Sequence, residues 1–255
     1  MSIEEFARRI LCRELGRDVA LHDDRTRPSM YDLRVGVADA PEIAIECVGA
    51  VDPVRVETWN IGPANGPMLL QLRSDWHVVL EPQARLKEVR TRLEQLLQRC
   101  EQLGMEGFVP IDFRMRRANN SLYSAFKALR IDSVHRFEYP STGKVDLGMT
   151  GVGGSVDTLG HAVPGWIGDF LRAPQRADVL KKLRISGAQQ CHVFVPVAFG
   201  GVPWAVESYL GSQINTLPPT APDLPAPVTA AWITYGVNGL GWNGSSWHLF
   251  NTTFD

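Results

Sequence analysis

Lysine and arginine are absent after Arg184, and the last 71 residues carry only Glu207, Asp223 and Asp255 as charged side chains. The whole chain of 255 residues has a formal net charge of −2, which argues against a dedicated binder of polyanions. A phosphate-binding surface needs cations, so any such surface must lie in the first 184 residues. The first 184 residues are near neutral overall, and this net charge still allows a local phosphate-binding surface among them.

Long apolar runs are also missing. No segment of about 18 apolar residues could span a bilayer, so we expect no membrane partner. The opening residues MSIEEFARRIL lack the apolar core of a signal peptide, and the expected location is the cytoplasm. The four cysteines, Cys12, Cys47, Cys100 and Cys191, form no CxxC pair, and we expect reduced, mostly buried thiols.

Several common catalytic motifs are absent. The chain has no HExxH, GxSxG or GxxxxGK[ST] sequence and no GxGxxG run after a strand, and its six histidines are isolated from one another. The run GVGGS at 151–155 lacks the lysine that follows a phosphate-binding loop, so it is interpreted as a flexible loop. These absences exclude the best-known signatures of metalloproteases, serine hydrolases and nucleotide-binding enzymes.

Apolar periodicity predicts a mixed α/β protein. Helices are expected at 2–15, 82–103, 119–129 and 166–183, the last interrupted by Pro174. Strands are expected at 31–37, 42–48, 76–80, 191–197 and 229–235, with an irregular glycine-rich segment at 148–165 and a proline-rich connector at 213–228. The strands at 31–37 and 42–48 are predicted to form a meander with one apolar face.

Two carboxylates in this predicted meander could carry chemistry. Asp32 and Glu46 lie on the less apolar faces of neighbouring strands, and metal-dependent phosphodiester hydrolysis requires carboxylates that converge on Mg²⁺. The two side chains meet only if the turn between the strands sets the right register, because a slip of one residue moves a side chain to the other face. Pairing with nearby arginines at a strand edge is the alternative interpretation of both residues.

At these residues the chain resembles the PD-(D/E)XK nuclease superfamily. The matching pieces are the first helix, the segment RPSMYDLRVGV and the segment EIAIECV. The resemblance implies that Asp32 and Glu46 bind divalent metal, and that a first-helix acid, Glu5 or Glu14, assists them. The superfamily's lysine, which helps to activate water, is replaced by Val48, and Pro28 lies four residues before Asp32 instead of directly before it. Arg34 and Arg55 are the candidates to replace this lysine, although arginine stays protonated and cannot act as a base.

The resemblance also implies a fold and a domain organisation. The expected fold is a restriction-endonuclease-like mixed sheet flanked by helices, with a strand-rich C-terminal extension. We expect a nuclease-like core over residues 1–200, with an insertion at about 104–165, and an extension at 201–255 packed on the core. The wider layout resembles a set of actinobacterial proteins without an assigned activity.

Two further segments suggest partners. Basic residues gather between 112 and 136, and a DNA or RNA contact is weighed there against a solvated face; the candidate residues are Arg114, Arg116, Arg117, Lys127 and Arg130. Four tryptophans, Trp204, Trp232, Trp242 and Trp247, lie in the tail without cations. We expect this tail to cover the core or to contact a protein partner, including a second copy of the chain.

Three functions follow in order of preference. The first is a divergent nuclease-like protein that binds nucleic acid or protein without cleaving it, because losing the lysine removes about 3–4 kcal/mol of transition-state stabilisation. The second is an active Mg²⁺-dependent DNase or RNase that uses Asp32 and Glu46. The third is an unrelated scaffold or small-molecule enzyme.

Overall fold

The computed structural model describes residues 1–23, 30–108, 117, 119–137, 142–151 and 153–254. The chain forms two compact units, one of residues 1–51 and 152–255 and one of residues 52–151. The second unit is therefore a continuous insertion into the first. None of the described helices is long and apolar enough to cross a membrane.

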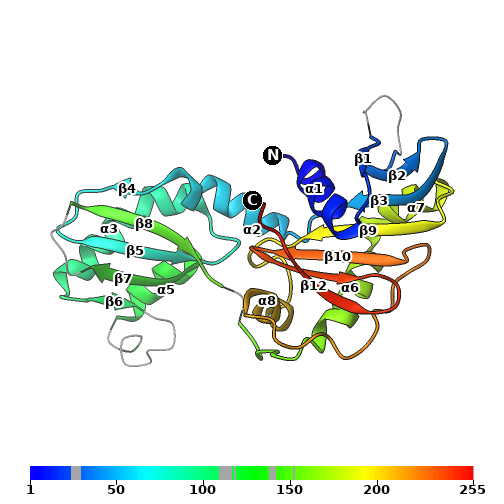
Figure 1. Ribbon diagram of the computed structural model, residues 1–255. Coiled ribbons are helices and arrows are strands. Elements are labelled where there is room, and N and C mark those ends of the chain that lie inside the picture. Colours follow the sequence, from blue (N-terminus) through cyan, green and yellow to red (C-terminus); the bar gives the residue numbers. More distant parts are fainter. Residues whose placement is uncertain (24–29, 109–116, 118, 138–141, 152, 255) are drawn as a thin grey trace. The chain divides into compact units, whose positions relative to one another are not determined.

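The first unit contains a mixed sheet of seven strands in the order β1-β2-β3-β9-β10-β11-β12 (Figure 1). Its strands are β1 (Ala20–Leu21), β2 (Leu33–Val37), β3 (Ala40–Cys47), β9 (Gln190–Pro196), β10 (Ala230–Tyr235), β11 (Asn238–Trp242) and β12 (Trp247–Asn251). Strand β9 pairs in parallel with both β3 and β10, and the other neighbours are antiparallel. Strand β3 is thus an interior strand of the sheet.

Helices pack on both faces of this sheet. One face carries α1 (Ile3–Leu15), whose buried Ala7, Ile10 and Leu11 belong to a core cluster with β2 and β3 residues. The opposite core cluster includes residues of α6 (Ala162–Arg172), α7 (Ala177–Ile185) and α8 (Trp204–Gly211), with the short 3-10 helix Pro174–Arg176 between α6 and α7. Because helices cover both faces, Ile43, Ala44, Ile45 and Glu46 are all buried, so the single apolar face predicted for this meander is wrong for β3.

The second unit has a sheet of five strands in the order β4-β8-β5-β7-β6. Its elements are α2 (Pro53–Ile61), a 3-10 helix (Pro63–Asn65), β4 (Met68–Leu69), β5 (Asp75–Leu80), α3 (Leu86–Gln102), β6 (Gly107–Phe108), α5 (Asn120–Ala128), β7 (Ile131–Phe137) and β8 (Lys144–Met149). Buried side chains of α3 and α5 share a core cluster with alternate residues of β5, such as Trp76 and Val78. The mixed α/β class expected from the sequence is confirmed in both units.

The domain boundaries differ from those expected. The inserted unit covers 52–151 instead of about 104–165, and β10, β11 and β12 belong to the same sheet as β2 and β3 instead of forming an extension. Trp232 and Trp247 are buried, and the indole of Trp247 donates a hydrogen bond to the Thr220 carbonyl over 2.7 Å. These two tryptophans are part of the core of the first unit.

Candidate functional site

The register between β2 and β3 places Asp32 beside Glu46. Leu33 pairs with Ile45, and the Asp32 amide donates a hydrogen bond to the Ile45 carbonyl over 3.2 Å. Asp32 directly precedes β2, and its charge is one of the causes of the raised pKa of Glu46. The two carboxylates therefore lie close enough to interact, as the metal-site hypothesis requires.

A β-bulge produces this register. The pairing shifts by one residue between Val35 and Gly36, and the pairs beyond the shift, such as Gly36 with Pro41, would place Asp32 opposite Ile45 if they continued unchanged. Gly36 has a φ of +91°, and a Cβ atom there would lie 3.2 Å from the Glu42 amide nitrogen. Glycine at this position thus permits the bulge in the pairing of β2 with β3.

Asp32 is held at the end of β2 by main-chain contacts. Its Oδ2 accepts a hydrogen bond from the Cys47 amide over 2.7 Å. Burial raises the pKa of Asp32, while the hydrogen bond from Cys47 and the charge of Lys182 act in the opposite direction. The Cys47 bond fixes one of the two carboxylate oxygens of Asp32.

Glu46 is a buried carboxylate beside a lysine. Its side chain is 4% exposed, and Lys182 Nζ lies 3.2 Å from Glu46 Oε1. The distance is that of an ion pair, but the atoms lack hydrogen-bond alignment, and Oε1 has no hydrogen-bond partner among the residues described. Burial, followed by the charge of Asp32, raises the pKa of Glu46 to about 8 despite the opposing effect of Lys182. Lys182 is the cation that offsets part of the cost of burying this oxygen.

Lys182 comes from α7, which contacts β3. Leu183 of this helix is buried in the core between α7 and the sheet. The neighbouring Lys182 therefore lies at the edge of this core, where it reaches Glu46. Burial lowers the pKa of Lys182, but the charges of Glu46 and Asp32 outweigh burial and raise it. Lys182 also lies 3.8 Å from Asp178, one helical turn before it. The lysine is therefore protonated and centred among acids.

A small cavity of about 160 Å³ opens beside Asp32, and it is lined by Ser2, Glu4, Leu21, Asp23 and Asp32. Ser2 caps α1 by accepting a hydrogen bond from the Glu5 amide over 3.2 Å, which orients the first turn and with it Glu4. The charges of Glu4 and Asp23 both act to raise the pKa of Asp32. The cavity is acidic, and this is the environment that attracts a divalent cation.

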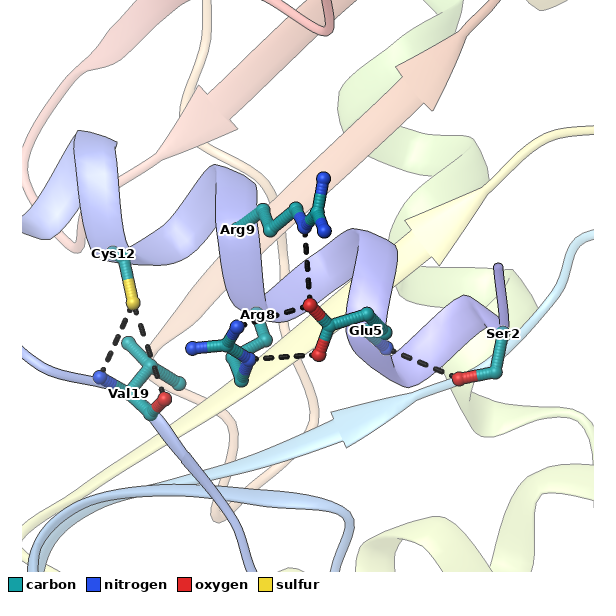
Figure 2. A network of polar contacts seen from close by, with 6 residues as sticks. All are labelled: Ser2, Glu5, Arg8, Arg9, Cys12 and Val19. Atoms are coloured by element: carbon teal, nitrogen blue, oxygen red, sulfur yellow. Dashed lines mark hydrogen bonds and ion pairs between the residues drawn. The ribbon is translucent and has the colours of Figure 1, made fainter. Parts of the chain in front are cut away.

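The first-helix acids named from the sequence have other contacts. Figure 2 shows Glu5 bound by Arg8 Nε at 2.8 Å and by Arg9 Nε at 3.0 Å. The hydrogen bonds from these two arginines lower the pKa of Glu5 to about 2. Glu14 lies 2.8 Å from Arg13. The structure thus brings Glu4, instead of Glu5 or Glu14, next to Asp32.

The opposite end of α1 is tied down as well. Figure 2 shows Cys12 Sγ near Val19, whose amide donates to the sulfur over 3.3 Å. Val19 is buried and directly precedes β1. This contact helps to fix the helix that carries Glu4.

Each of the two arginines named from the sequence donates to a main-chain carbonyl. Arg34 donates a hydrogen bond to the Gly36 carbonyl. Arg55 belongs to the second unit, where it donates to the Thr150 carbonyl. Val48 is buried, and its amide bonds the Phe194 carbonyl over 2.8 Å. Within the first unit, Lys182 is a cation in contact with Glu46.

The predicted basic segment is largely engaged or lies outside the described residues. Arg114 and Arg116 fall outside them, and Arg117 is exposed. Lys127 and Arg130 both approach Glu81, at 2.9 and 3.8 Å. These two cations therefore have an internal counter-ion.

Sequence reasoning missed Lys182, Glu4 and Asp23. The helix pattern ADVLKKLR before the strand CHVFVPV was a signal for Lys182, because such a helix packs against the sheet that contains the strand. For Glu4 the signal was the cap at Ser2, which fixes the direction of the first turn.

Comparisons with protein-family models, with curated proteins and with solved structures found no match for the chain. Function is therefore argued from the site alone.

Proposed function

We propose that the first unit is a metal-dependent phosphodiesterase that hydrolyses nucleic acid, with a site formed by Asp32, Glu46 and Lys182. The observation that carries this proposal is the approach of Lys182 Nζ to Glu46 Oε1 at 3.2 Å, with Asp32 near enough for its charge to act on Glu46. Val48 cannot supply the positive charge that the resemblance implies at its position, but Lys182 brings a positive charge to Glu46 in the folded protein.

The fold supports the proposal at a coarser level. A mixed sheet with helices on both faces is the architecture that the resemblance to PD-(D/E)XK nucleases implies. A restriction-endonuclease-like fold is part of the proposal, since it predicts the carboxylates on adjacent strands after a first helix.

The residues present fit a divalent cation. Glu46 Oε1 is buried without a hydrogen-bond partner among the described atoms, and the set of oxygen donors suits Mg²⁺. In the described part of the chain, no three His, Cys, Asp or Glu side chains group closely enough to hold a metal ion by themselves. Asp32 and Glu46 would supply two of the ligands of Mg²⁺, and water, which Mg²⁺ usually retains, would supply the others. When bound, the ion would polarise the phosphate and lower the pKa of water.

The chain's own residues have separate roles in this proposal. Lys182 supplies a positive charge and a hydrogen-bond donor toward the attacked phosphate, where negative charge develops. The Cys47 amide orients Asp32, and Glu4 adds negative charge to the lining of the cavity beside Asp32. Burial of Glu46 excludes water from one side of its carboxylate and strengthens its interactions.

One observation favours a second function, binding without cleavage. Because Glu46 already has Lys182 as a counter-ion, the pair can persist without metal, and the site would then be structural. Such a protein would bind nucleic acid or a protein partner, as the loss of the lysine at position 48 first suggested.

A cleavage assay tests the two functions. Purified protein is incubated with plasmid, single-stranded DNA and RNA, each with Mg²⁺, Mn²⁺ or EDTA. We expect metal-dependent cleavage that Glu46→Gln abolishes and that Glu42→Gln, an exposed acid on the same strand, retains. Absence of cleavage under every condition, with folded protein, would reject the proposed activity in favour of the second function.

A further inference from the structure

The second unit contains a cavity of about 450 Å³ between α2 and the first turns of α3. Its apolar lining includes Val54 and Leu86, and its polar lining includes Lys87, Arg90, Glu57 and Gln83. This volume lies in the range of ligand-binding clefts.

The walls of this cavity are fixed relative to each other. The hydroxyl of Thr58, on α2, contacts the Pro82 carbonyl in the segment that leads into α3. A Cβ atom at Gly62, just after α2, would lie 3.0 Å from the Leu86 side chain, so glycine permits this close approach. The cavity is therefore a built feature of the unit.

The acids of α3 are largely engaged away from the cavity. Glu94 accepts a hydrogen bond from the Gln71 amide over 3.0 Å, and Glu101 accepts from the Arg73 and Ser74 amides over 2.8 to 3.1 Å. Both acids thus hold the loop before β5.

The N-terminal half of α3 carries more cations than acids. Lys87, Arg90 and Arg92 are exposed there, while Glu88 lies 3.3 Å from Arg85. The second unit has fourteen Lys and Arg against twelve Asp and Glu, whereas the first unit has an acidic excess. The cavity therefore lies in the more basic unit, with Glu57 as its acidic lining residue.

We propose that this cavity, with Lys87 and Arg90 in its lining, binds the phosphodiester backbone of a nucleic acid strand. Lys87 and Arg90 are three residues apart, so they are neighbours on one helix face and can contact one strand together. Arginine matches phosphate geometry with paired donors, and lysine adds a compact charge. The apolar wall at Val54 and Leu86 contacts the sugars. The choice of nucleic acid as the anion rests on the proposed function.

A binding assay tests this surface separately from cleavage. Full-length protein carrying Glu46→Gln is titrated in EDTA with short labelled single-stranded DNA, duplex DNA and RNA at several salt concentrations. The double variant Lys87→Gln/Arg90→Gln is expected to bind about tenfold more weakly or worse, with a salt slope shallower by about two. The matched control Arg73→Gln/Arg99→Gln removes the same charge, from exposed residues that do not line the cavity, and should bind within about twofold of its parent.

The outcomes separate the two proposals. Weak binding by the cavity variant alone, with rescue by the charge-preserving Lys87→Arg/Arg90→Lys, supports the surface even if the wild type cleaves nothing. Equal losses in the cavity and control variants would overturn the surface, whether or not cleavage occurs. Binding of inorganic phosphate without binding of any oligonucleotide would overturn it as well.

Discussion

Lys182 and Glu46 are in contact, with 3.2 Å between Nζ and Oε1, although one lies on α7 and the other on β3. The inserted second unit separates them in sequence, and the packing of α7 on the sheet brings them together. Glu46 therefore has a cation beside it, although Val48, two residues further along the chain, is apolar.

Replacing Lys182 should identify the working cation. We expect Lys182→Met to lower the rate of metal-dependent cleavage by about 10²–10³-fold, because under the proposed function it removes a charge that would stabilise the transition state. Lys181→Met removes the exposed neighbouring lysine, and Arg34→Met removes the arginine bound to the Gly36 carbonyl. Rates are measured on a labelled oligonucleotide, and both controls should stay within about twofold of the wild type. A normal rate for Lys182→Met would exclude Lys182 from catalysis.

The acid on the first helix can be identified by metal binding. We expect Glu4→Gln to weaken Mn²⁺ binding about tenfold, because it removes a negative charge from the cavity beside Asp32. Glu14→Gln, on the same helix but paired with Arg13, should leave the affinity unchanged. Calorimetric titration measures both variants, and equal affinities would contradict a role for Glu4.

The apolar periodicity of the sequence predicted the helix and strands around this site, but not which of their side chains lie close together in the fold. The expected helix at 2–15 is observed as Ile3–Leu15, with Ser2 and Gly16 as its caps, because helix signals are local. The strands carrying Asp32 and Glu46 were also expected. Their register was not predictable, since it depends on the bulge at Gly36, a conformational choice of one residue.

Long-range placement explains the other differences. The contact of Lys182 with Glu46 depends on β9 pairing in parallel with β3, which no local pattern indicates. The bounds of the insertion at 52–151 were not predictable from the sequence, because α2 follows β3 after a short loop whose composition resembles its surroundings. Strand β1 has two residues, which are too few to show the alternation of apolar and polar side chains that predicts a strand.

Glu46 should make stability fall as the pH rises. Its pKa is about 8 in the folded protein and 4.5 in the unfolded chain, so the folded state retains the proton over this interval. The stabilisation is complete below about pH 4.5 and is lost as the pH rises through about 8. In EDTA, Glu46→Gln should lose less unfolding free energy than the wild type between pH 5 and 9, as denaturant titrations measure. Parallel curves for the two proteins would contradict burial of an ionisable Glu46.

Glu207 should be an important polar residue in the core of the first unit. It is buried, and its two oxygens accept from the Gly200 amide over 3.0 and 3.1 Å, while Tyr235 donates to it over 3.0 Å. Glu207→Ala leaves both donors without a partner and should cost about 3 kcal/mol of unfolding free energy. Tyr235→Phe removes one donor and should cost about 1 kcal/mol. Urea denaturation measures both, and a smaller loss for Glu207→Ala than for Tyr235→Phe would contradict this account.

His192 should make the protein sensitive to acid. The indole Nε1 of Trp232 lies 3.4 Å from His192 Nδ1 and donates to it, so the neutral ring carries its proton on Nε2, which faces Gln190 Oε1 at 3.2 Å. Burial lowers the pKa of His192 to about 4 from 6.5, so the unfolded chain binds a proton that the folded protein does not. Stability is therefore complete above about pH 6.5 and falls by about 3 kcal/mol as the pH drops toward 4. His192→Asn keeps an acceptor for Trp232 but does not titrate. Its unfolding free energy, measured by denaturant titration from pH 7 to 4, should fall by about 3 kcal/mol less than that of the wild type. An equal fall in both proteins would assign the acid sensitivity to other groups.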